Sequence, residues 1–323
     1  TPELYVQHIV EVFREVRRVM RGDGTCWVNM GDSYAGGHVT YSDKRWQHGA
    51  GPNMNMHTLK GDGLKPKDLV GVPWRVAFAL QADGWWLRSD IIWSKPNPMP
   101  ESVQDRPTRA HEYLFLLAKA AQYFYDADAI REPHSPDGRK ATTAPIGDSS
   151  HQNYRGSHDH ERWPNAGRNK RSVWEIATQP FPDAHFATFP EALVKPCIQA
   201  GSSERGCCPE CGAAWERVVE KEQPPVALRN RSGDTKMAFH SRQIGGGQKI
   251  QDWYDANPPH MTGWRPTCNH TADPVPCVIL DLFAGSGTVG VVARKAGRRS
   301  ILIDLKAEYM EMAKRRMAQG VLT

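Results

Sequence analysis

The sequence predicts an α/β fold built on a doubly wound, mostly parallel β-sheet, with a small insertion set apart from it. The carboxyl-terminal part alternates strand, helix, strand and helix between Cys277 and Met317, an order typical of a parallel sheet covered by helices. The amino-terminal part has helical periodicity from Thr1 to Arg21, followed by short apolar runs. Most of the cysteines lie between residues 204 and 274, so we expect that segment to form the insertion.

The predicted elements can be placed in chain order. Thr1-Pro2-Glu3 is a typical helix start, since threonine can cap the first N–H groups and proline fits the first turn. Gly22-Asp23-Gly24 turns the chain. Segments 36–63 and 131–185 have no clear period and are expected to be loops. The predicted helices cover 1–21, 67–83, 189–200, 288–296 and 307–317, and the predicted strands cover 25–30, 85–93, 112–119, 122–126, 277–282 and 300–304.

The composition excludes several classes of protein. No apolar run reaches the ~18 residues that a membrane-spanning helix needs, and no secretory signal opens the sequence. The 41 Lys and Arg residues against 36 Asp and Glu give a net charge of +5, which permits a polyanion partner without requiring one. Seven cysteines in 323 residues do not make a disulfide scaffold. We therefore expect a protein of the reducing cytoplasm.

The most informative segment runs from Val278 to Thr288. An apolar strand leads through Asp281-Leu-Phe-Ala-Gly285-Ser-Gly287 into a helix. Glycines let the backbone pass close to a ligand, and the helix start offers free N–H groups. The next predicted strand ends in Asp304, where an acid can accept the ribose hydroxyls of a nucleoside-like ligand. Because the pattern is not Gly-x-Gly-x-x-Gly, it fits dinucleotide phosphates poorly.

Asp281 to Thr288 closely resembles the S-adenosylmethionine motif of the exocyclic-amine DNA methyltransferases, which make N4-methylcytosine or N6-methyladenine. Residues 186–201 resemble the other cofactor motif of that family, and the order of the pieces, with the cofactor motif last, is that of its β group. The resemblance implies a Rossmann-like methyltransferase sheet that binds S-adenosylmethionine. The cofactor-binding residues that it implies are Asp281, Phe283, Gly285, Gly287, Thr288, Asp304, Phe189, Pro190 and Glu191.

The middle motifs of the family are matched by residues 24–34, 85–100 and 106–119. Asn29, Asp32 and Lys95 are candidates for the pocket of the target base. The alternative for Asp32 is that it serves only as a residue of the turn after the strand. The family's catalytic motif is Ser or Asp followed by Pro-Pro and an aromatic residue. Family members carry it before the helix that here starts at Thr1, and this sequence has no match there. Asn257-Pro258-Pro259-His260 is far better explained as a proline-rich turn than as a relocated catalytic loop. The catalytic residues stay unknown, and we expect an amino-terminally incomplete sequence of an active enzyme.

The cysteine-rich insertion predicts a structural zinc site. Cys208-Pro-Glu-Cys211 forms a Cys-x-x-Cys knuckle, and Cys268-Asn-His270 supplies a second pair. Three thiolates and one imidazole satisfy tetrahedral zinc and leave no open position for catalysis. Ordinary reduced thiols are the alternative, and the adjacent Cys207 could take the place of a ligand.

Two regions are candidates for DNA contact. Arg106 and Arg109 follow the proline-rich loop after residue 94 and could meet phosphates. The segment 131–185 is the candidate for target recognition, because its cationic and aromatic side chains suit phosphates, guanine edges and unstacked bases. We assign DNA binding there to Arg168, Lys170 and Arg171. The zinc insertion is the competing candidate.

These features predict a site-specific DNA methyltransferase that acts on an exocyclic amine of a flipped base, N4 of cytosine in preference to N6 of adenine. A non-catalytic DNA-binding remnant is the alternative, and an RNA or protein methyltransferase a third. Double-stranded DNA and a cognate restriction endonuclease are the expected partners, in a prokaryotic or phage-encoded system without a membrane. The expected domains are a catalytic half (1–130), a recognition loop region (131–185), a cofactor half (186–203 and 275–323) and the zinc insertion (204–274).

Overall fold

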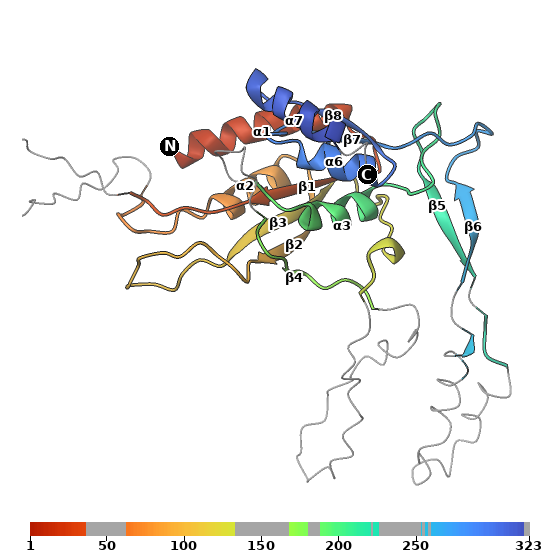
Figure 1. The fold of residues 1–323 in the computed structure, drawn as a ribbon, viewed down its shortest axis with the longest axis horizontal. Coiled ribbons are helices and arrows are strands. Elements are labelled where there is room, and N and C mark those ends of the chain that lie inside the picture. The colour runs from red at the N-terminus through yellow and green to blue at the C-terminus, as the bar shows by residue number, and fades with distance from the viewer. Residues whose placement is uncertain are drawn as a thin grey trace, which may run out of the picture. The chain divides into compact units, whose positions relative to one another are not determined.

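The computed structural model of the chain divides into two compact units (Figure 1). The first contains Thr1–Tyr125, Arg171–Gly201 and Val278–Thr323, and the second contains Asp126–Lys170 and Ser202–Cys277. The structure describes residues 1–36, 63–132, 168–179, 188–220, 222–225, 253, 256–257 and 260–319. Much of the predicted loop segments 36–63 and 131–185, and the proline pair of the turn at 257–260, lie outside the described residues.

The first unit contains both helices and strands, whereas the described part of the second has a strand pair and a 3-10 turn. The elements of the first unit are α1 (Pro2–Val19), β1 (Thr25–Met30), α2 (Val72–Ala82), β2 (Trp86–Ser94), β3 (His111–Ala118), β4 (Val173–Glu175), α3 (Glu191–Gly201), β7 (Val278–Asp281), α6 (Thr288–Lys295), β8 (Arg299–Leu302) and α7 (Ala307–Gln319). Those of the second are η2 (Asp128–Ile130), β5 (Trp215–Glu220) and β6 (His260–Pro266). Among the described residues, no helix has both the length and the apolar character needed to cross a membrane.

The sheet of the first unit is mixed, which corrects the expectation of a mostly parallel one. A four-stranded sheet has the order β1-β3-β2-β4, and a separate pair joins β7 to β8. β3 runs antiparallel to both β1 and β2, while the β2–β4 and β7–β8 pairs are parallel. Sequence periodicity reports which faces of a strand are buried and does not report its direction, so it could not reveal that β3 is reversed.

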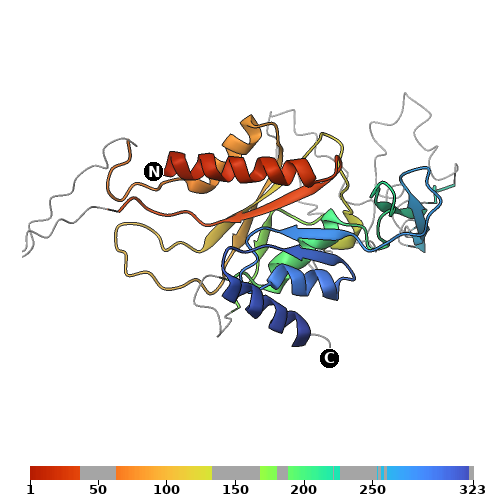
Figure 2. The same ribbon diagram turned by 90° about the horizontal axis from the view of Figure 1, so that it is seen from above.

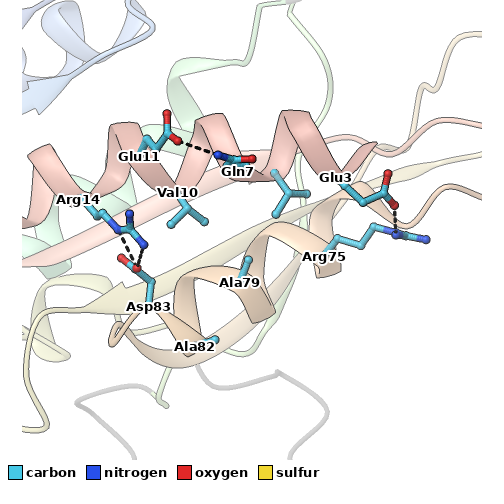
Figure 3. Close-up of a pocket in the computed structure, with 10 residues that line it drawn as sticks. Glu3, Gln7, Val10, Glu11, Arg14, Arg75, Ala79, Ala82 and Asp83 are labelled. Carbon is cyan, nitrogen blue, oxygen red and sulfur yellow. Dashed lines mark hydrogen bonds and ion pairs between the residues drawn. The ribbon is translucent and has the colours of Figure 1, made fainter. Parts of the chain in front are cut away.

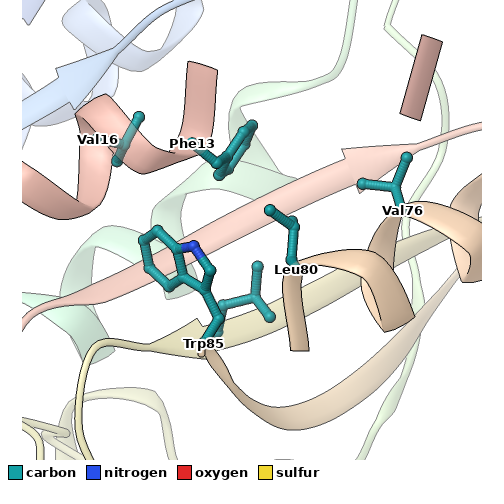
Figure 4. Packing of buried hydrophobic residues seen from close by; sticks show 6 residues of the cluster. Phe13, Val16, Val76, Leu80 and Trp85 are labelled. Carbon is teal, nitrogen blue, oxygen red and sulfur yellow. The ribbon is translucent and has the colours of Figure 1, made fainter. Parts of the chain in front are cut away.

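The core on one face of this sheet lies under α1 and α2 (Figure 4). Phe13 and Val16 of α1 meet Val76 and Leu80 of α2. Trp85 and Leu117 of β3 complete the buried cluster. α1 follows the periodic pattern seen in the sequence, and Thr1 caps it by accepting the N–H of Leu4 at 3.3 Å. Burying such side chains contributes roughly 1.5–3 kcal/mol each, so this cluster fixes α1 on the sheet.

The core on the other side is organised by α3. Leu193 and Cys197 pack with Trp93 and Trp174, and partly buried Trp27 of β1 joins them. Further around the same helix, Val194 and Ile198 pack with Val292 of α6, to which partly buried Ile279 of β7 is added. One helix therefore connects the four-stranded sheet with the β7–β8 pair.

Two predicted elements differ in the structure. The helix expected from residue 67 begins at Val72. Lys67 and Gly71 have positive φ values of 72° and 74°, which a right-handed helix does not allow, so the helix cannot include them. The strand expected at 122–126 is not formed, and residues 119–122 bend instead. In this segment, the backbone N–H of Phe124 donates a hydrogen bond to the carbonyl of Asp23 at 2.9 Å.

Candidate functional site: a nucleoside cradle and a cysteine–histidine group

The glycine turn after β7 has the geometry that the sequence predicted for a ligand loop. The N–H of Phe283 donates to the carboxylate of Asp281 at 3.0 Å, so the chain turns away at once from the strand. Gly285 and Gly287 have φ values of +49° and +75°. Gly287 is the cap residue of α6 and Thr288 its first residue, so the turn ends at a helix amino terminus with backbone donors available.

Asp304 joins this turn to the loop that follows β8. One carboxylate oxygen accepts the N–H of Gly285 at 2.9 Å, and the other accepts the N–H of Lys306 at 3.0 Å. β7 and β8 are parallel, with Asp281 opposite Leu302, so both loops leave the same edge of the sheet. Ligands of open α/β sheets bind at this carboxyl edge.

Asp281 is a half-buried residue at the end of β7, where the turn begins. Burial raises the pKa of its carboxyl group, the N–H of Phe283 opposes that rise, and the charge of Asp304 adds to it. Its Oδ2 atom is buried and has no hydrogen-bond partner among the described residues. A buried carboxylate oxygen without a donor is costly, so this atom marks a place where a ligand donor would be bound.

Exposed apolar side chains stand beside the two acids. Phe283 is 62% exposed and Leu305 103% exposed. Ile303, on the other side of Asp304, is also exposed. Sequence reasoning named Phe283 and missed the other two, although apolar residues on both sides of a strand-end acid were a visible signal. Phe283 and Leu305, with Asp281, Gly285 and Asp304, are called the cradle below. Its exposed apolar side chains can pack against a flat ring, and its carboxylates can accept hydrogen bonds from hydroxyl groups.

Glu191 belongs to a network of ion pairs and hydrogen bonds that reaches the glycine turn. Its carboxylate pairs with Lys295 at 2.7 Å and with Arg316 at 3.5 Å. Arg316 in turn donates to the hydroxyl of Thr288 at 2.8 Å and to that of Ser286 at 3.1 Å. The network ties α3 and α7 to the glycine turn, and Arg316 was not singled out from the sequence. Neighbouring Pro190 is buried and Phe189 partly buried in the core.

The three predicted pocket residues are held by other parts of the chain. Asn29 donates its side-chain amide to the carbonyl of Tyr113 at 3.1 Å. The side chain of Asp32 is 5% exposed and accepts the N–H groups of Gly71 and Val72 at 3.1 and 3.0 Å. It therefore anchors the start of α2, and its place in a base pocket stays a prediction. Lys95 pairs with a glutamate, Glu112, and lies 4.4 Å above the ring of Trp93.

The predicted phosphate contacts Arg106 and Arg109 are also engaged internally. Arg106 bonds Glu101 at 2.6 Å, which lowers the pKa of that carboxyl group, and stacks 3.9 Å over Tyr34. Arg109 donates to the carbonyl of Asp32. Both guanidinium groups keep further N–H donors, since each carries five, so these contacts leave DNA binding open as a prediction.

A groove of about 600 Å³ lies elsewhere, between α1 and α2 (Figure 3). Its floor is apolar, with Val10, Ala79 and Ala82, and ion pairs close its two ends, Glu3 with Arg75 and Arg14 with Asp83. None of the predicted cofactor or pocket residues lines it. Four of its charges form these two ion pairs, and Glu11 accepts a hydrogen bond from the side-chain amide of Gln7 at 3.1 Å, so the chemistry favours the glycine turn as the site.

The second unit brings the predicted zinc ligands together. The ligand atoms of Cys208, Cys211, Cys268 and His270 all lie within 4.8 Å of one another. Nδ1 of His270 is 3.6 Å from the sulfur of Cys208, and Nε2 faces Glu210 at 3.8 Å. This group could hold a metal ion. Cys207 is not part of this group. Its backbone N–H donates to the carbonyl of Val275 at 2.8 Å, and its carbonyl accepts the N–H of Val275 at 2.8 Å.

The knuckle itself favours a thiolate. Gly212, at φ 73°, follows the second cysteine, and its N–H donates to the carbonyl of Cys208 at 2.8 Å. The backbone N–H of Cys211 points at the sulfur of Cys208 and lowers the pKa of that thiol to about 7. Thiolates are the form that binds metals.

Two of the three predicted DNA-binding residues near position 170 share one acid. Glu132 pairs with Arg168 at 3.3 Å and with Lys170 at 3.4 Å. Arg171 accepts the indole N–H of Trp174 on its carbonyl at 2.7 Å. The rest of the predicted recognition segment, 133–167, lies outside the described residues, so its role stays a prediction.

Comparison with known proteins decides the family. A family model described as DNA methylase matches residues 1–208 and 276–315, more than half of the chain. The chain belongs to this DNA methylase family. The match omits 209–275, the part of the chain that holds Cys211, Cys268 and His270, so the family pattern does not include the complete cysteine–histidine group.

Two curated relatives of the DNA methylase family extend the match. The chain is 36% identical to the Type II methyltransferase M.SmaI of Serratia marcescens, over 97% of this chain and 74% of that protein. It is 35% identical to the Type II methyltransferase M.Cfr9I of Citrobacter freundii, over 97% of this chain and 71% of that protein. A solved structure of PvuII DNA methyltransferase (cytosine-N4-specific) shares the fold, with a TM-score of 0.51 at 14% identity over 98% of this chain and 71% of that one.

Proposed function

We propose that the chain binds S-adenosylmethionine at the glycine turn and takes part in methylating an exocyclic amine of a DNA base. The observation that carries this proposal is the carboxylate of Asp304, which accepts the N–H of Gly285 while lying at the carboxyl edge of β7 and β8. Membership of the DNA methylase family makes DNA the substrate class. When bound, S-adenosylmethionine supplies an activated methyl group.

The residues of the cradle fit this cofactor. Asp304 keeps lone pairs for ribose hydroxyls after accepting two backbone N–H groups. The unpartnered Oδ2 of Asp281 is buried and suits an ammonium or amine donor. Phe283 and Leu305 offer exposed apolar surface for a flat ring. Glu191 and Arg316 act indirectly, by holding the turn in place.

Calorimetry with S-adenosylmethionine tests the cofactor site. Asp304→Ala should weaken binding by about 1–3 kcal/mol, the scale for losing a paired acceptor in a partly buried site. Asp273→Ala, at a charge in the second unit, is the matched control and should bind as the unmodified chain does. Equal affinity of both variants would remove Asp304 from the site.

For the target we propose N4 of cytosine in preference to N6 of adenine, in double-stranded DNA with the base flipped out of the helix. The relatives reported above are Type II methyltransferases, so a cognate restriction endonuclease is the proposed partner. Transfer of labelled methyl groups to DNA, followed by nucleoside analysis, separates the two bases. Label in N6-methyladenine would replace cytosine, and label in neither base would reject methyl transfer by this chain.

We also propose that Cys208, Cys211, Cys268 and His270 hold one structural zinc ion. Ligand atoms around tetrahedral zinc are separated by about 3.5–4 Å when Zn–S is ~2.3 Å, close to the spread of up to 4.8 Å in this group. The carboxylate of Glu210 beside Nε2 of His270 is a typical partner for a metal-bound histidine.

Metal analysis of purified protein tests the zinc site. The unmodified chain and Cys207→Ser should each contain one zinc, since Cys207 lies outside the group. Cys211→Ser should contain none, and the second unit should lose order. Protein prepared without chelator that carries no zinc would leave these cysteines as reduced thiols.

A further inference from the structure

Within the second unit, one arginine of β5 links the part that holds the cysteine–histidine group to the segment around η2. β5 and β6 form the antiparallel β5–β6 pair, which is drawn in teal and blue in Figure 2. The pair adjoins the cysteine knuckle, since the N–H of Trp215, the first residue of β5, donates to the carbonyl of Gly206 at 3.0 Å. The side chain of Arg217 is 18% exposed, and its guanidinium group lies 4.6 Å above the ring of Trp264 in β6. The β5–β6 pair therefore holds Arg217 in place.

Two carboxylates from outside the β5–β6 pair accept hydrogen bonds from this guanidinium group. Arg217 donates to Asp126 at 2.7 Å and also to Glu204. The side chain of Asp126 is only 7% exposed, and its other oxygen accepts the N–H of Ala129, within η2, at 3.1 Å. A buried carboxylate is costly when its cationic partner is removed. The position at which η2 begins therefore depends on Arg217.

η2 leads directly to two of the proposed DNA contacts. Glu132 and Arg168 exchange backbone hydrogen bonds, with N···O distances of 2.9 and 2.8 Å. The carboxylate of Glu132 also pairs with the side chains of Arg168 and Lys170, at 3.3 and 3.4 Å. Arg131, the residue directly after η2, donates to the side chain of Asn169 at 3.1 Å. Two cations thus share one acid, and the backbone of both is tied to the end of η2.

The β5–β6 pair itself offers little to a DNA phosphate. Arg217 is engaged with two acids, and Arg265, the other arginine of the pair, bonds Glu216 at 2.6 Å. His260, the first residue of β6, faces Glu220 at 4.0 Å. Because affinity for the DNA backbone comes from cations that neutralise phosphates, these strands suit a supporting role better than direct contact.

We infer that Arg217 is a positioning residue for DNA binding, through which the β5–β6 pair holds Arg168 and Lys170 in place. Arg217 fixes Asp126 and the start of η2, and η2 leads to the residue that pairs with both cations. Every step of this path lies within the second unit. The inference rests on the proposed assignment of Arg168 and Lys170 to DNA binding.

Hydrogen exchange on the full chain tests the positioning. In Arg217→Gln, the amides of Glu132 and Arg168 should exchange at least tenfold faster than in the unmodified chain, because the start of η2 is released. The amides of Cys207 and Val275, which bond each other's carbonyls beside the knuckle, should keep their rates. They report whether the rest of the unit stays folded, and they do so without reference to a metal.

Arg265→Gln is the matched control, since it makes the same substitution in the same strand pair at an arginine that is 67% exposed. It should change none of the four rates. Arg217→Lys keeps the charge within reach of Asp126 and should restore part of the protection. Unchanged exchange at Glu132 and Arg168 in Arg217→Gln, equal acceleration by Arg265→Gln, or acceleration of all four amides together would overturn the inference.

Binding to a mixed-sequence DNA duplex tests the consequence. Arg217→Gln should flatten the slope of log affinity against log salt by about 0.9 for each lost phosphate contact, as Arg168→Ala with Lys170→Ala should. All three changes together should weaken binding no further, because residues that act through one another are not additive. Arg265→Gln, which removes the same charge, should keep the slope.

Two outcomes of the DNA experiment separate the inference from the proposed function. An unchanged slope in Arg217→Gln, beside a flattened one in Arg168→Ala with Lys170→Ala, would overturn the inference alone. An unchanged slope in Arg168→Ala with Lys170→Ala would reject the proposed DNA contacts, and the inference with them, even where the exchange rates show that Arg217 holds the pair.

Discussion

Replacing Gly287 with alanine perturbs the glycine turn at one atom. A methyl group there would lie 2.7 Å from Cβ and 3.0 Å from Cα of Ala313, on α7. Neither atom can rotate away, because both belong to the rigid part of a helix. The residue also sits at φ +75°, a conformation that alanine rarely takes.

The magnitude follows from these two effects. The left-handed conformation costs about 1–2 kcal/mol for a residue with a Cβ, and overpacking of a close-packed contact costs roughly 1–3 kcal/mol. We expect Gly287→Ala to lower the free energy of unfolding by about 2–5 kcal/mol. Gly297→Ala is a matched control, since its φ is +72° and nothing lies within 4 Å of the added atom. It should lose only the conformational part, about 1–2 kcal/mol.

Urea unfolding followed by circular dichroism measures both variants. The difference between them isolates the contact with Ala313. Combining Gly287→Ala with Ala313→Gly removes the nearer atom and should recover part of the loss. Equal destabilisation by the two glycine substitutions, or no recovery in the double variant, would refute the close packing of the turn against α7.

Two further predictions concern charge. Because burial raises the pKa of Asp281, its ionised form destabilises the fold above that pKa, and the cost disappears as pH falls below the ordinary value of 3.8. Asp281→Asn should therefore raise the free energy of unfolding at pH 7 and progressively less toward pH 4; a pH-independent gain in urea unfolding would contradict the buried carboxylate. Changing Arg168, Lys170 and Arg171 together to alanine should flatten the slope of log DNA affinity against log salt, by about 0.9 for each lost phosphate contact, and an unchanged slope would place the DNA surface elsewhere.

Local groupings of residues were predictable from the sequence. The glycine turn with Asp281 and Asp304 was recognisable because a strand–turn–helix of this kind has particular residue types at fixed spacing. The same holds for Cys208, Cys211, Cys268 and His270, since few side chains make tetrahedral ligand sets. The structure brings each of these groups together.

Contacts between distant segments were not predictable. The bond between Glu191 and Arg316 joins two ordinary surface residue types that lie far apart in the sequence. The antiparallel β3 and the late start of α2 depend on partners elsewhere in the fold, such as the carboxylate of Asp32 that binds the N–H groups of Gly71 and Val72. Periodicity carries no information about such partners.

Amide NMR spectra of the chain during titration with S-adenosylmethionine test the central claim most directly. Saturable shifts should appear at Phe283, Gly285 and Lys306, whose N–H groups bond the two carboxylates of the cradle. They should be absent from Asp304→Ala at the same cofactor concentration. Shifts confined to Val10 and Ala79 in the α1–α2 groove, or no shifts at all, would contradict a cofactor site at the glycine turn.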